Sequence, residues 1–508
     1  MKALVLLLLP GVVAAQVQVR SYYDTFTAAG PLLDHVSALA NGDVLYYDQA
    51  AGGLARMGPN GAVMWYERIN IGSSPGEITS VADAAFQSNG NIVLVVLHRD
   101  GTGQYHPGLV RLDADGALLS AEIAQDMDVG LADWLKVAVL AGTDEIRMTI
   151  RGTGDGGTFH AFAADGTWQS SLSYTGNSEM PVNWVRNGAQ LVGANVGKLT
   201  VYSTDGVPSW SLVPGATIMG SESYLTVIGD VTPIPIGYAF SFLRVGGPAL
   251  MAPGIGLVSA NGIFQGGIVF LVDELQGVPN TFTYPSITST LGGLAMVANN
   301  GSSTAPKGYL FTCNNDLSNT QVLKISIGDE AFPSDITSTA LFGSMMIGTV
   351  HASGAGQRLV AQSAFGADMS SCFPTTPYAV LPFPMGTLPS TAYSGTPTTT
   401  TWTAVTPTLQ AGVFSSDHLC GPDAVAEYGS DANYALYPVP AQDVLHLKWP
   451  IAEPVNVRVL DALGRVVLSA RTLNAETQLD ISTLAQGSYF LHVTGSHGKV
   501  RVLPFMVE

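Results

Sequence analysis

Charged residues are scarce in this chain of 508 residues, and basic ones are scarcer than acidic ones. Only 12% of positions are charged, with 21 basic against 39 acidic residues and a formal net charge of −18. Residues 437–508 hold as many basic as acidic side chains, so the whole net charge belongs to residues 1–436. A body this acidic argues against nucleic acid and anionic membrane surfaces as partners, because both attract Lys and Arg. The acidity fits solubility in an extracellular medium.

Cysteine is also scarce, with only Cys313, Cys372 and Cys420 in the sequence. Three cysteines are too few for a disulfide framework in a chain of this length. An oxidising compartment on an export route favours one bridge and one leftover thiol. We expect Cys372 and Cys420 to form the bridge, which would stabilise the fold by about 3–4 kcal/mol by closing the loop between them. The cysteines are far apart in sequence and no histidine pair has ligand spacing, so we predict no metal site and no cofactor.

Long apolar runs are absent except for one at the start of the sequence. Lys2 is followed by the apolar residues 3–9, and small residues end at Ala15. This pattern predicts a secretory signal peptide over residues 1–15, cut between Ala15 and Gln16. Its apolar core is too short to span a membrane comfortably, and no other run reaches about 18 apolar residues. We therefore predict no transmembrane segment in the mature chain.

Motifs with defined chemistry are absent as well. The segment 72–76 spells Gly-x-Ser-x-Gly, but Pro75 and the lack of a following helical pattern do not suit a nucleophile elbow. We expect three histidines in the first part of the chain to be surface or hydrogen-bonded residues. We expect three recurring tryptophans to pack in the core instead of forming a platform for a sugar. These residues are His98, His106 and His160, and Trp65, Trp168 and Trp210. We predict no catalytic residue.

Turn signals are abundant. Asn-Gly begins at residues 41, 60, 89, 187, 261 and 300, and Asp-Gly begins at residues 100, 115, 155, 165 and 205. These dipeptides favour tight β-hairpins with type I′ turns, in which both central residues have positive φ. Their density is typical of an antiparallel meander, and it does not suit alternating strands and helices.

The turns belong to a longer repeat. An apolar strand, a turn and an aromatic or apolar residue recur around Gly61, Gly116, Gly166, Gly206 and Gly262, at a period that suits one four-stranded propeller blade. Ile-Thr-Ser recurs at residues 78–80, 287–289 and 336–338, each time before an apolar strand. We expect an all-β fold in which residues 16–373 form a propeller-like body of about seven blades. A stack of β-sandwich domains is the alternative.

Residues 374–436 are rich in Thr and Pro. Alternating Thr and apolar residues favour an exposed two-stranded ribbon, whereas the prolines exclude a central strand. We expect a closing element of the body followed by a linker, with residues 421–433 as the region of any proteolytic removal of the C-terminal domain. A mucin-like or disordered stretch is the alternative.

Residues 437–508 carry a distinct set of motifs. Alternating strands at residues 443–447 and 455–459, a turn at residues 461–465 and a further strand at residues 489–493 predict a small Ig-like β-sandwich. In order and spacing the motifs resemble the C-terminal sorting domain of the type IX (Por) secretion system of Bacteroidota. The residues that carry the resemblance are Tyr437, Pro438, Pro440, Ala441, Asp443, Gly464, Arg465, Gly487 and Tyr489.

The resemblance implies a route and a partner. Such a domain is a signal for the outer-membrane translocon, is usually cleaved, and leaves a cargo that is released or joined to surface lipopolysaccharide. We therefore expect a secreted or cell-surface protein that contacts the type IX machinery. The body resembles the degenerate propellers that accompany this domain, and we expect it to be a non-catalytic binder of a glycan or protein. A secreted hydrolase or lyase, with its site on one face of the propeller, is the alternative.

Overall fold

The computed structural model describes most of the chain. The described residues are 17–24, 33–38, 43–48, 52–58, 63–72, 77–130, 134–151, 157–174, 183–187, 190–195, 198–214, 217–219, 222–246, 251–272, 285–290, 293–300, 307–325, 332–338, 345–350, 357–363, 373–385, 387–388, 395–412, 414–420, 435–437, 441–448, 455–461, 466–472, 476–494 and 500–507. They are all strands and turns, in two compact units that meet between Cys420 and Gly421.

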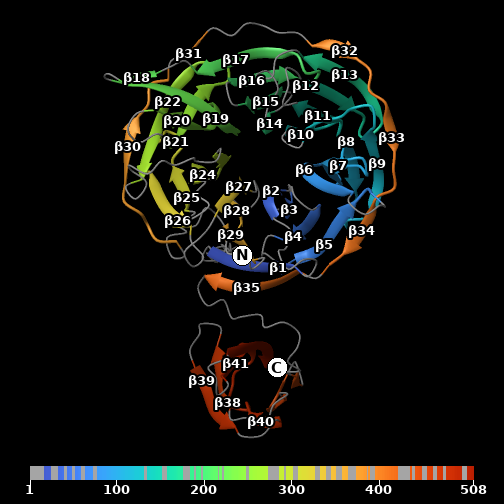
Figure 1. Cartoon of the computed structure of the whole chain (residues 1–508). Helices are drawn as coiled ribbons and strands as arrows, with labels where there is room; N and C mark the ends of the chain where they lie inside the picture. Colours follow the sequence, from blue (N-terminus) through green and yellow to red (C-terminus); the bar gives the residue numbers. More distant parts are fainter. Residues whose placement is uncertain are drawn as a thin grey trace, which may run out of the picture. The chain divides into compact units, whose positions relative to one another are not determined.

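In the first unit, the described strands form seven antiparallel sheets arranged as blades around a ring (Figure 1). Six blades are runs of consecutive strands, with the innermost strand first. Blade 1 holds β2 (Leu33–Ala38), β3 (Val44–Asp48), β4 (Gly53–Met57) and β5 (Val63–Asn70); blade 2 holds β6 (Ile78–Phe86), β7 (Ile92–Arg99), β8 (Tyr105–Leu112) and β9 (Leu118–Ala124); blade 3 holds β10 (Trp134–Val139), β11 (Ile146–Arg151), β12 (Gly157–Phe162) and β13 (Trp168–Tyr174).

The ring continues in the same way. Blade 4 holds β14 (Asn183–Asn187), β15 (Gln190–Asn195), β16 (Lys198–Ser203) and β17 (Pro208–Pro214); blade 5 holds β19 (Glu222–Ile234), β20 (Gly237–Val245), β21 (Met251–Ser259) and β22 (Phe264–Val272), with the short β18 (Thr217–Met219) beside β19; blade 6 holds β23 (Ser286–Ser289), β24 (Leu294–Asn299), β25 (Gly308–Cys313) and β26 (Gln321–Ile325). The all-β, propeller-like prediction is therefore confirmed.

Blade 7 closes the ring with strands from both ends of the unit. It combines β27 (Phe332–Ser338), β28 (Met345–Val350) and β29 (Gln357–Ser363) with β1 (Val17–Asp24) as the fourth strand. The register pairs Val17 with Ser363 and Tyr23 with Gln357. Since β1 comes from the start of the chain, the last blade is complete only when this segment has joined it.

The second strand of blade 2, β7, is apolar because neighbouring blades cover both of its faces. In β7, residues 92–98 are buried without interruption. The alternate side chains of β7 enter two different core clusters, since Leu94 packs with one and Val95 with the other. β-Branched residues suit such a strand. The outer strand β5 is only partly buried, as expected at the rim.

The Asp-Gly and Asn-Gly hairpins exist, but their turn type differs from the predicted one. In the four described turns centred on Asp115, Asp165, Asp205 and Asn261, only the following glycine has positive φ, between 81° and 91°. The strand register shifts beside each of these turns. This is a type I turn followed by a glycine bulge, which needs one left-handed residue where type I′ needs two.

These turns also hold neighbouring blades together. The side chains of Arg56, Arg111 and Arg147, each in one blade, donate to the carbonyls of Ala114, Asp165 and Thr204 in the turn of the next. Two of the recurring tryptophans do the same: Trp65 Nε1 donates to Ala114 O, and Trp210 Nε1 lies 3.0 Å from Ala260 O. The repeat in the sequence therefore reflects contacts between blades as well as turns within them.

Residues 373–420 form a belt that follows the outer edges of the blades (Figure 1). Thr375 bridges Leu323 in blade 6, and six short strands then add to blades 5, 4, 3, 2, 1 and 7, against the direction of the preceding chain. The belt strands are β30 (Tyr378–Pro382), β31 (Thr387–Leu388), β32 (Thr396–Thr398), β33 (Trp402–Ala404), β34 (Thr408–Ala411) and β35 (Phe414–Cys420). Among the described residues the expected two-stranded ribbon is not present, because each described belt strand pairs with a blade instead of another belt strand. The compact unit extends to Cys420.

The second unit is a small sandwich. One sheet holds β36 (Ala435–Tyr437), β37 (Val444–Lys448) and β40 (Glu476–Asp480), and the other holds β39 (Val466–Thr472), β38 (Val455–Asp461), β41 (Gly487–Thr494) and β42 (Val500–Val507). A common core that includes Leu445, Val459 and Leu491 lies between them. This agrees with the predicted Ig-like β-sandwich.

Candidate functional site

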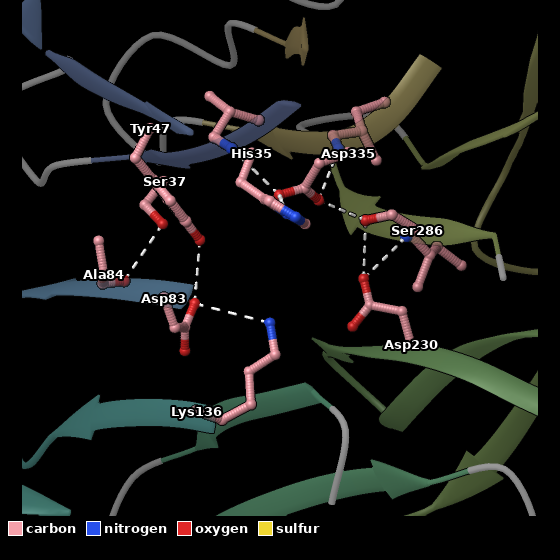
Figure 2. Close-up of polar contacts among 12 residues, drawn as sticks. His35, Ser37, Tyr47, Asp83, Ala84, Lys136, Asp230, Ser286 and Asp335 are labelled. Atoms are coloured by element: carbon pink, nitrogen blue, oxygen red, sulfur yellow. Dashed lines mark hydrogen bonds and ion pairs between the residues drawn. The ribbon is translucent and has the colours of Figure 1, made fainter. Parts of the chain in front are cut away.

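The candidate site is a set of polar side chains on the innermost strands, pointing toward one another across the centre of the ring (Figure 2). Each comes from the innermost strand of a different blade. We call it the channel cluster: His35, Asp83, Lys136, Asp230, Ser286 and Asp335.

Backbone irregularities position these side chains. The register of the innermost strand shifts next to His35 in β2, Asp83 in β6, Asp230 in β19 and Asp335 in β27. A β-bulge re-aims the side chain beside it and increases the local twist. The sequence therefore uses the same device in four blades to turn a polar residue toward the centre.

Asp335 of blade 7 joins three blades. Its Oδ2 accepts the Val36 backbone N–H of blade 1 at 3.1 Å and lies 3.5 Å from His35 Nδ1. Its Oδ1 accepts the backbone N–H of the next residue, Ile336, at 2.8 Å. The same oxygen lies 2.7 Å from Ser286 Oγ of blade 6. One fifth of the Asp335 side chain is exposed.

Asp230 makes the same kind of link between blades 5 and 6. Its Oδ1 accepts the Val231 N–H at 2.7 Å, and its Oδ2 accepts the Ile287 N–H of blade 6 at 3.0 Å. Ser286 Oγ lies 2.9 Å from the same Oδ2. Ser286 therefore stands between two carboxyl groups.

Asp83 links blades 1, 2 and 3. Its Oδ2 accepts the Val137 N–H at 2.7 Å, and its Oδ1 accepts the Tyr47 hydroxyl at 2.9 Å. Lys136 Nζ forms an ion pair with Oδ1 at 3.7 Å. Both oxygens of each channel carboxyl group are thus engaged by groups from this chain.

The surroundings shift the acidity of these groups. Burial, and then the charge of Asp335, raises the pKa of Asp230 to about 6. Burial also opposes ionisation of Asp335, but contacts with His35, Ser286 and the Val36 N–H keep its pKa below the ordinary value. Burial raises the pKa of Tyr47 well above its ordinary value, and the charges of Asp83 and Asp335 raise it further.

The channel cluster was not found from the sequence, although a signal was present. The repeats at residues 287–289 and 336–338 were expected to precede the innermost strands, but they lie inside β23 and β27. The residues immediately before them are Ser286 and Asp335. A polar residue followed by an aliphatic one, in the innermost strand of six of the seven blades, is the pattern that marks the cluster.

The histidines singled out in the sequence lie outside the cluster. His98 and His106 face each other on β7 and β8, are nearly buried, and contact Thr79 and Met127 O respectively. His160 is fully buried between Ser171 Oγ and Thr158 Oγ1, at 2.7 and 2.9 Å. Burial lowers the pKa of His160 to about 4, so this imidazole is neutral at pH 7. Within the described residues, no group of three or more His, Cys, Asp or Glu side chains is arranged to hold a metal ion.

Some residues of the sorting motif have structural places in the sandwich. Tyr437 stacks on His446 with ring centroids 5.1 Å apart, and the fully buried Ala441 donates its N–H to Met506 O at 2.8 Å. The Asp443 carbonyl accepts the Ile481 N–H. Strand β41 begins at Gly487, and its third residue, Tyr489, packs in the core. Pro438, Pro440, Gly464 and Arg465 lie outside the described residues.

The remaining predicted sites are only partly visible. Ala15, Gln16 and Cys372 lie outside the described residues, and of Cys420 the structure describes the backbone, opposite Val19. Cys313 is a buried free thiol whose pKa burial raises to about 12. In the described ranges, no helix is long and apolar enough to cross a membrane.

Comparison with known families identifies the second unit. Residues 435–503 match the family described as the secretion system C-terminal sorting domain. The chain therefore carries a type IX sorting domain, which implies export and a cell-surface or secreted location. The presence of this domain also implies interaction with the secretion machinery. No curated protein matches the chain.

Solved structures with similar folds are distant in sequence. The WD40 domain of Neurospora crassa Pan2 is 10% identical, with a TM-score of 0.44 over 67% of this chain and 90% of that domain. PorZ, a surface component of the type IX secretion system of Porphyromonas gingivalis, is 9% identical, with a TM-score of 0.18 over 94% of this chain and 92% of PorZ. An α-L-arabinanase of Penicillium chrysogenum is 14% identical, with a TM-score of 0.39 over 58% of this chain and 96% of the enzyme.

Proposed function

We propose that the chain is an exported, non-catalytic propeller protein whose body binds an extracellular glycan or protein. The observation that supports this most is the state of the channel carboxyl groups. A general acid or base needs an oxygen directed at a substrate, whereas the oxygens of Asp83, Asp230 and Asp335 are engaged between blades. The cluster therefore works as part of the scaffold.

The partner surface belongs at one end of the ring. The tight Asp-Gly turns lie at the opposite end, where their carbonyls are occupied by the neighbouring blades. The outer strand of each blade ends, and the innermost strand of the next begins, at the other end; between β22 and β23 the sequence contains Phe282 and Tyr284. Surface connections held by a rigid scaffold are common binding elements.

Binding is tested with the full chain on arrays of glycans and of extracellular proteins. The proposal predicts saturable binding of a partner on one of these arrays. The double substitution of Phe282 and Tyr284 to Ser should weaken this binding at least tenfold. Ile263→Ser at the tight-turn end is the control, because Ile263 is 67% exposed and the substitution should not change binding. Equal binding by all three proteins would refute this placement of the surface.

A secreted hydrolase or lyase is the second candidate, and one observation favours it. A carboxyl group with a pKa of about 6 beside an ionised one is suited to acid–base catalysis, and Asp230 and Asp335 form such a pair. Turnover of a glycan or peptide that is lost in Asp230→Asn but kept in Asp83→Asn would establish the enzyme. Turnover unaffected by Asp230→Asn would exclude this pair as its site.

The sorting domain offers an apolar surface to the secretion machinery. On the outer face of its four-stranded sheet, Phe490 lies between Leu460 and Pro504 of the adjacent strands. Phe490 is 42% exposed and Met506 49% exposed. Exposed apolar residues gathered on one face mark interaction sites. We propose that this face, defined by Leu460, Phe490 and Met506, contacts the translocon.

The boundary between the units suits removal of the sorting domain. Belt strand β35 ends at Cys420 and β36 begins at Ala435. Cleavage in residues 421–434 would leave each belt strand on its blade. We propose that the signal peptide and the sorting domain are both removed, and that the body is released or attached at the outer membrane. Intact mass of the surface and medium forms measures both cuts.

A further inference from the structure

Ser286 has more hydrogen-bond contacts than its hydroxyl can supply with protons. Its Oγ lies 2.9 Å from Asp230 Oδ2 and 2.7 Å from Asp335 Oδ1 (Figure 2). A hydroxyl has one hydrogen, so it donates to only one of the two carboxyl groups. If both carboxyl groups were ionised, the contact that the hydroxyl hydrogen does not fill would set lone pairs of two oxygens against each other. Two negative charges would also lie beside one serine. A proton on one carboxyl group removes this conflict.

The hydrogen-bond partners decide which group carries the proton. Asp335 receives backbone N–H groups from Val36 and Ile336 and faces His35, all of which favour its ionised form. The groups that contact the Asp230 carboxyl group are the N–H groups of Val231 and Ile287 and the Ser286 hydroxyl, all of which are uncharged. A protonated Asp230 Oδ2 still has a lone pair for the Ile287 N–H while it donates to Ser286.

We infer that the carboxyl groups of Asp230 and Asp335 share a single proton through the Ser286 hydroxyl, with Asp230 Oδ2 donating to Ser286 Oγ and Ser286 Oγ donating to Asp335 Oδ1. This chain is a pH-dependent clasp between blades 5, 6 and 7. Ionisation of Asp230 removes the donor from the first link and places a second charge beside Asp335. The junction is then held less tightly.

The other titratable groups around the clasp are largely paired. His35 from β2 contacts Asp335, and Tyr47 from β3 donates to Asp83 of β6. Lys136 from β10 neutralises Asp83. The charges that pH sets in this part of the cluster are therefore the shared proton and that of His35, whose contact with Asp335 is an ion pair only when the imidazole is protonated.

The direction of the pH dependence follows from the two pKa shifts. The folded state holds the Asp230 proton up to about pH 6, whereas an ordinary Asp releases it near 3.8. This contribution to stability is complete below the ordinary value and is lost as pH rises through about 6. The Asp335 contribution has the opposite sign, since its pKa is lowered and its stabilisation is lost in stronger acid. The clasp should therefore hold best between these two limits.

Infrared spectroscopy of the full chain detects the proton directly, because a protonated carboxyl group has a C=O stretch separate from that of a carboxylate. The background should be Glu67→Gln with Glu122→Gln, since burial raises the pKa of both glutamates. We expect a carboxylic acid band at pH 5.5 that disappears with a midpoint near pH 6, and that Asp230→Asn abolishes it. Absence of this band at pH 5.5 would overturn the inference.

Two further variants test that the proton is shared. Asp335→Asn removes the second charge and should lower the midpoint of the band by at least one pH unit, whereas Asp83→Asn, in the same cluster, should leave it unchanged. Ser286→Ala should shift the frequency of the band by removing its acceptor. The matched control is Ser37→Ala, because Ser37 Oγ donates to the backbone carbonyl of Ala84, which is a neutral acceptor.

These results separate a shared proton from burial alone. If the midpoint stays near pH 6 in Asp335→Asn, the proton belongs to an isolated buried Asp230 and the sharing is refuted. If Asp335→Asn does not fold, the Ser286→Ala frequency decides, since an unchanged frequency contradicts the hydrogen bond to Ser286.

Discussion

Truncation of one belt residue, Phe383, tests whether the belt is an integral part of the propeller. Phe383 is 1% exposed and belongs to the core cluster that includes Val269 and Phe242. Its ring stacks on Phe242 with centroids 5.3 Å apart, and its N–H donates to Gly267 O at 2.8 Å. The side chain thus fixes the belt to blade 5 at a fully buried position.

The expected cost of Phe383→Ala is about 3–5 kcal/mol, the range for removing a buried aromatic side chain. Of this, about 0.5–1.5 kcal/mol should be specific to the pair with Phe242 and should appear as coupling in a double-mutant cycle with Phe242→Ala. Chemical unfolding followed by tryptophan fluorescence gives the free energies. The matched control is Gln410→Ala, an exposed residue of belt strand β34, which should stay within about 0.5 kcal/mol of wild type.

An effect of Phe383→Ala as small as that of Gln410→Ala would refute the reasoning, since the belt would then be dispensable for the stability of the ring. Limited proteolysis gives a second readout. We expect cleavage of the belt in Phe383→Ala under conditions in which the wild-type belt remains intact. Early cleavage in both proteins would also contradict an integral belt.

Three further predictions concern other parts of the molecule. Gly206→Ala should destabilise the body more than Gly142→Ala does. Both glycines have positive φ, but a Cβ at Gly206 would lie 3.0 Å from Phe159, whereas one at Gly142 meets nothing within 4 Å. The unfolding free energies of the two variants should differ by about 1–3 kcal/mol. Cys313 should resist alkylation at pH 8 until the protein unfolds, since burial raises its pKa to about 12, and rapid labelling of the native protein would contradict this. Phe490→Ser should reduce secretion without lowering the thermal stability of the sorting domain, as measured by surface protein and unfolding temperature, whereas unchanged secretion would remove the proposed apolar face.

The fold could be predicted from the sequence largely because its information is local. The glycine-containing turns and the strands between them repeat at the period of a blade, and both signals lie within a few residues. The turn type was wrong because Asp-Gly and Asn-Gly fit both type I′ and a type I turn with a glycine bulge. The two turn types differ in whether one or both central residues have positive φ. Here only the glycine, such as Gly116 or Gly166, has it, and the choice depends on the register of the flanking strands.

The belt and the channel cluster could not be predicted because they depend on contacts between distant segments. Belt strands such as Thr396–Thr398 are too short for a clear alternating pattern, and their partners lie in other blades. Ser286 and Asp335 are ordinary polar residues in the sequence. They become a site only when the ring brings three innermost strands together and the bulge in β27 turns Asp335 toward Ser286.

The most direct test of the central claim is export of the full chain and of a chain ending at Tyr434 in a bacterium with a type IX system, followed by fractionation and intact mass. The account predicts that the full chain reaches the surface or the medium, shortened at both ends, and that the truncated chain stays in the periplasm. Identical distribution of the two chains would contradict a sorting role for the C-terminal domain, and with it the proposal that this propeller acts outside the cell.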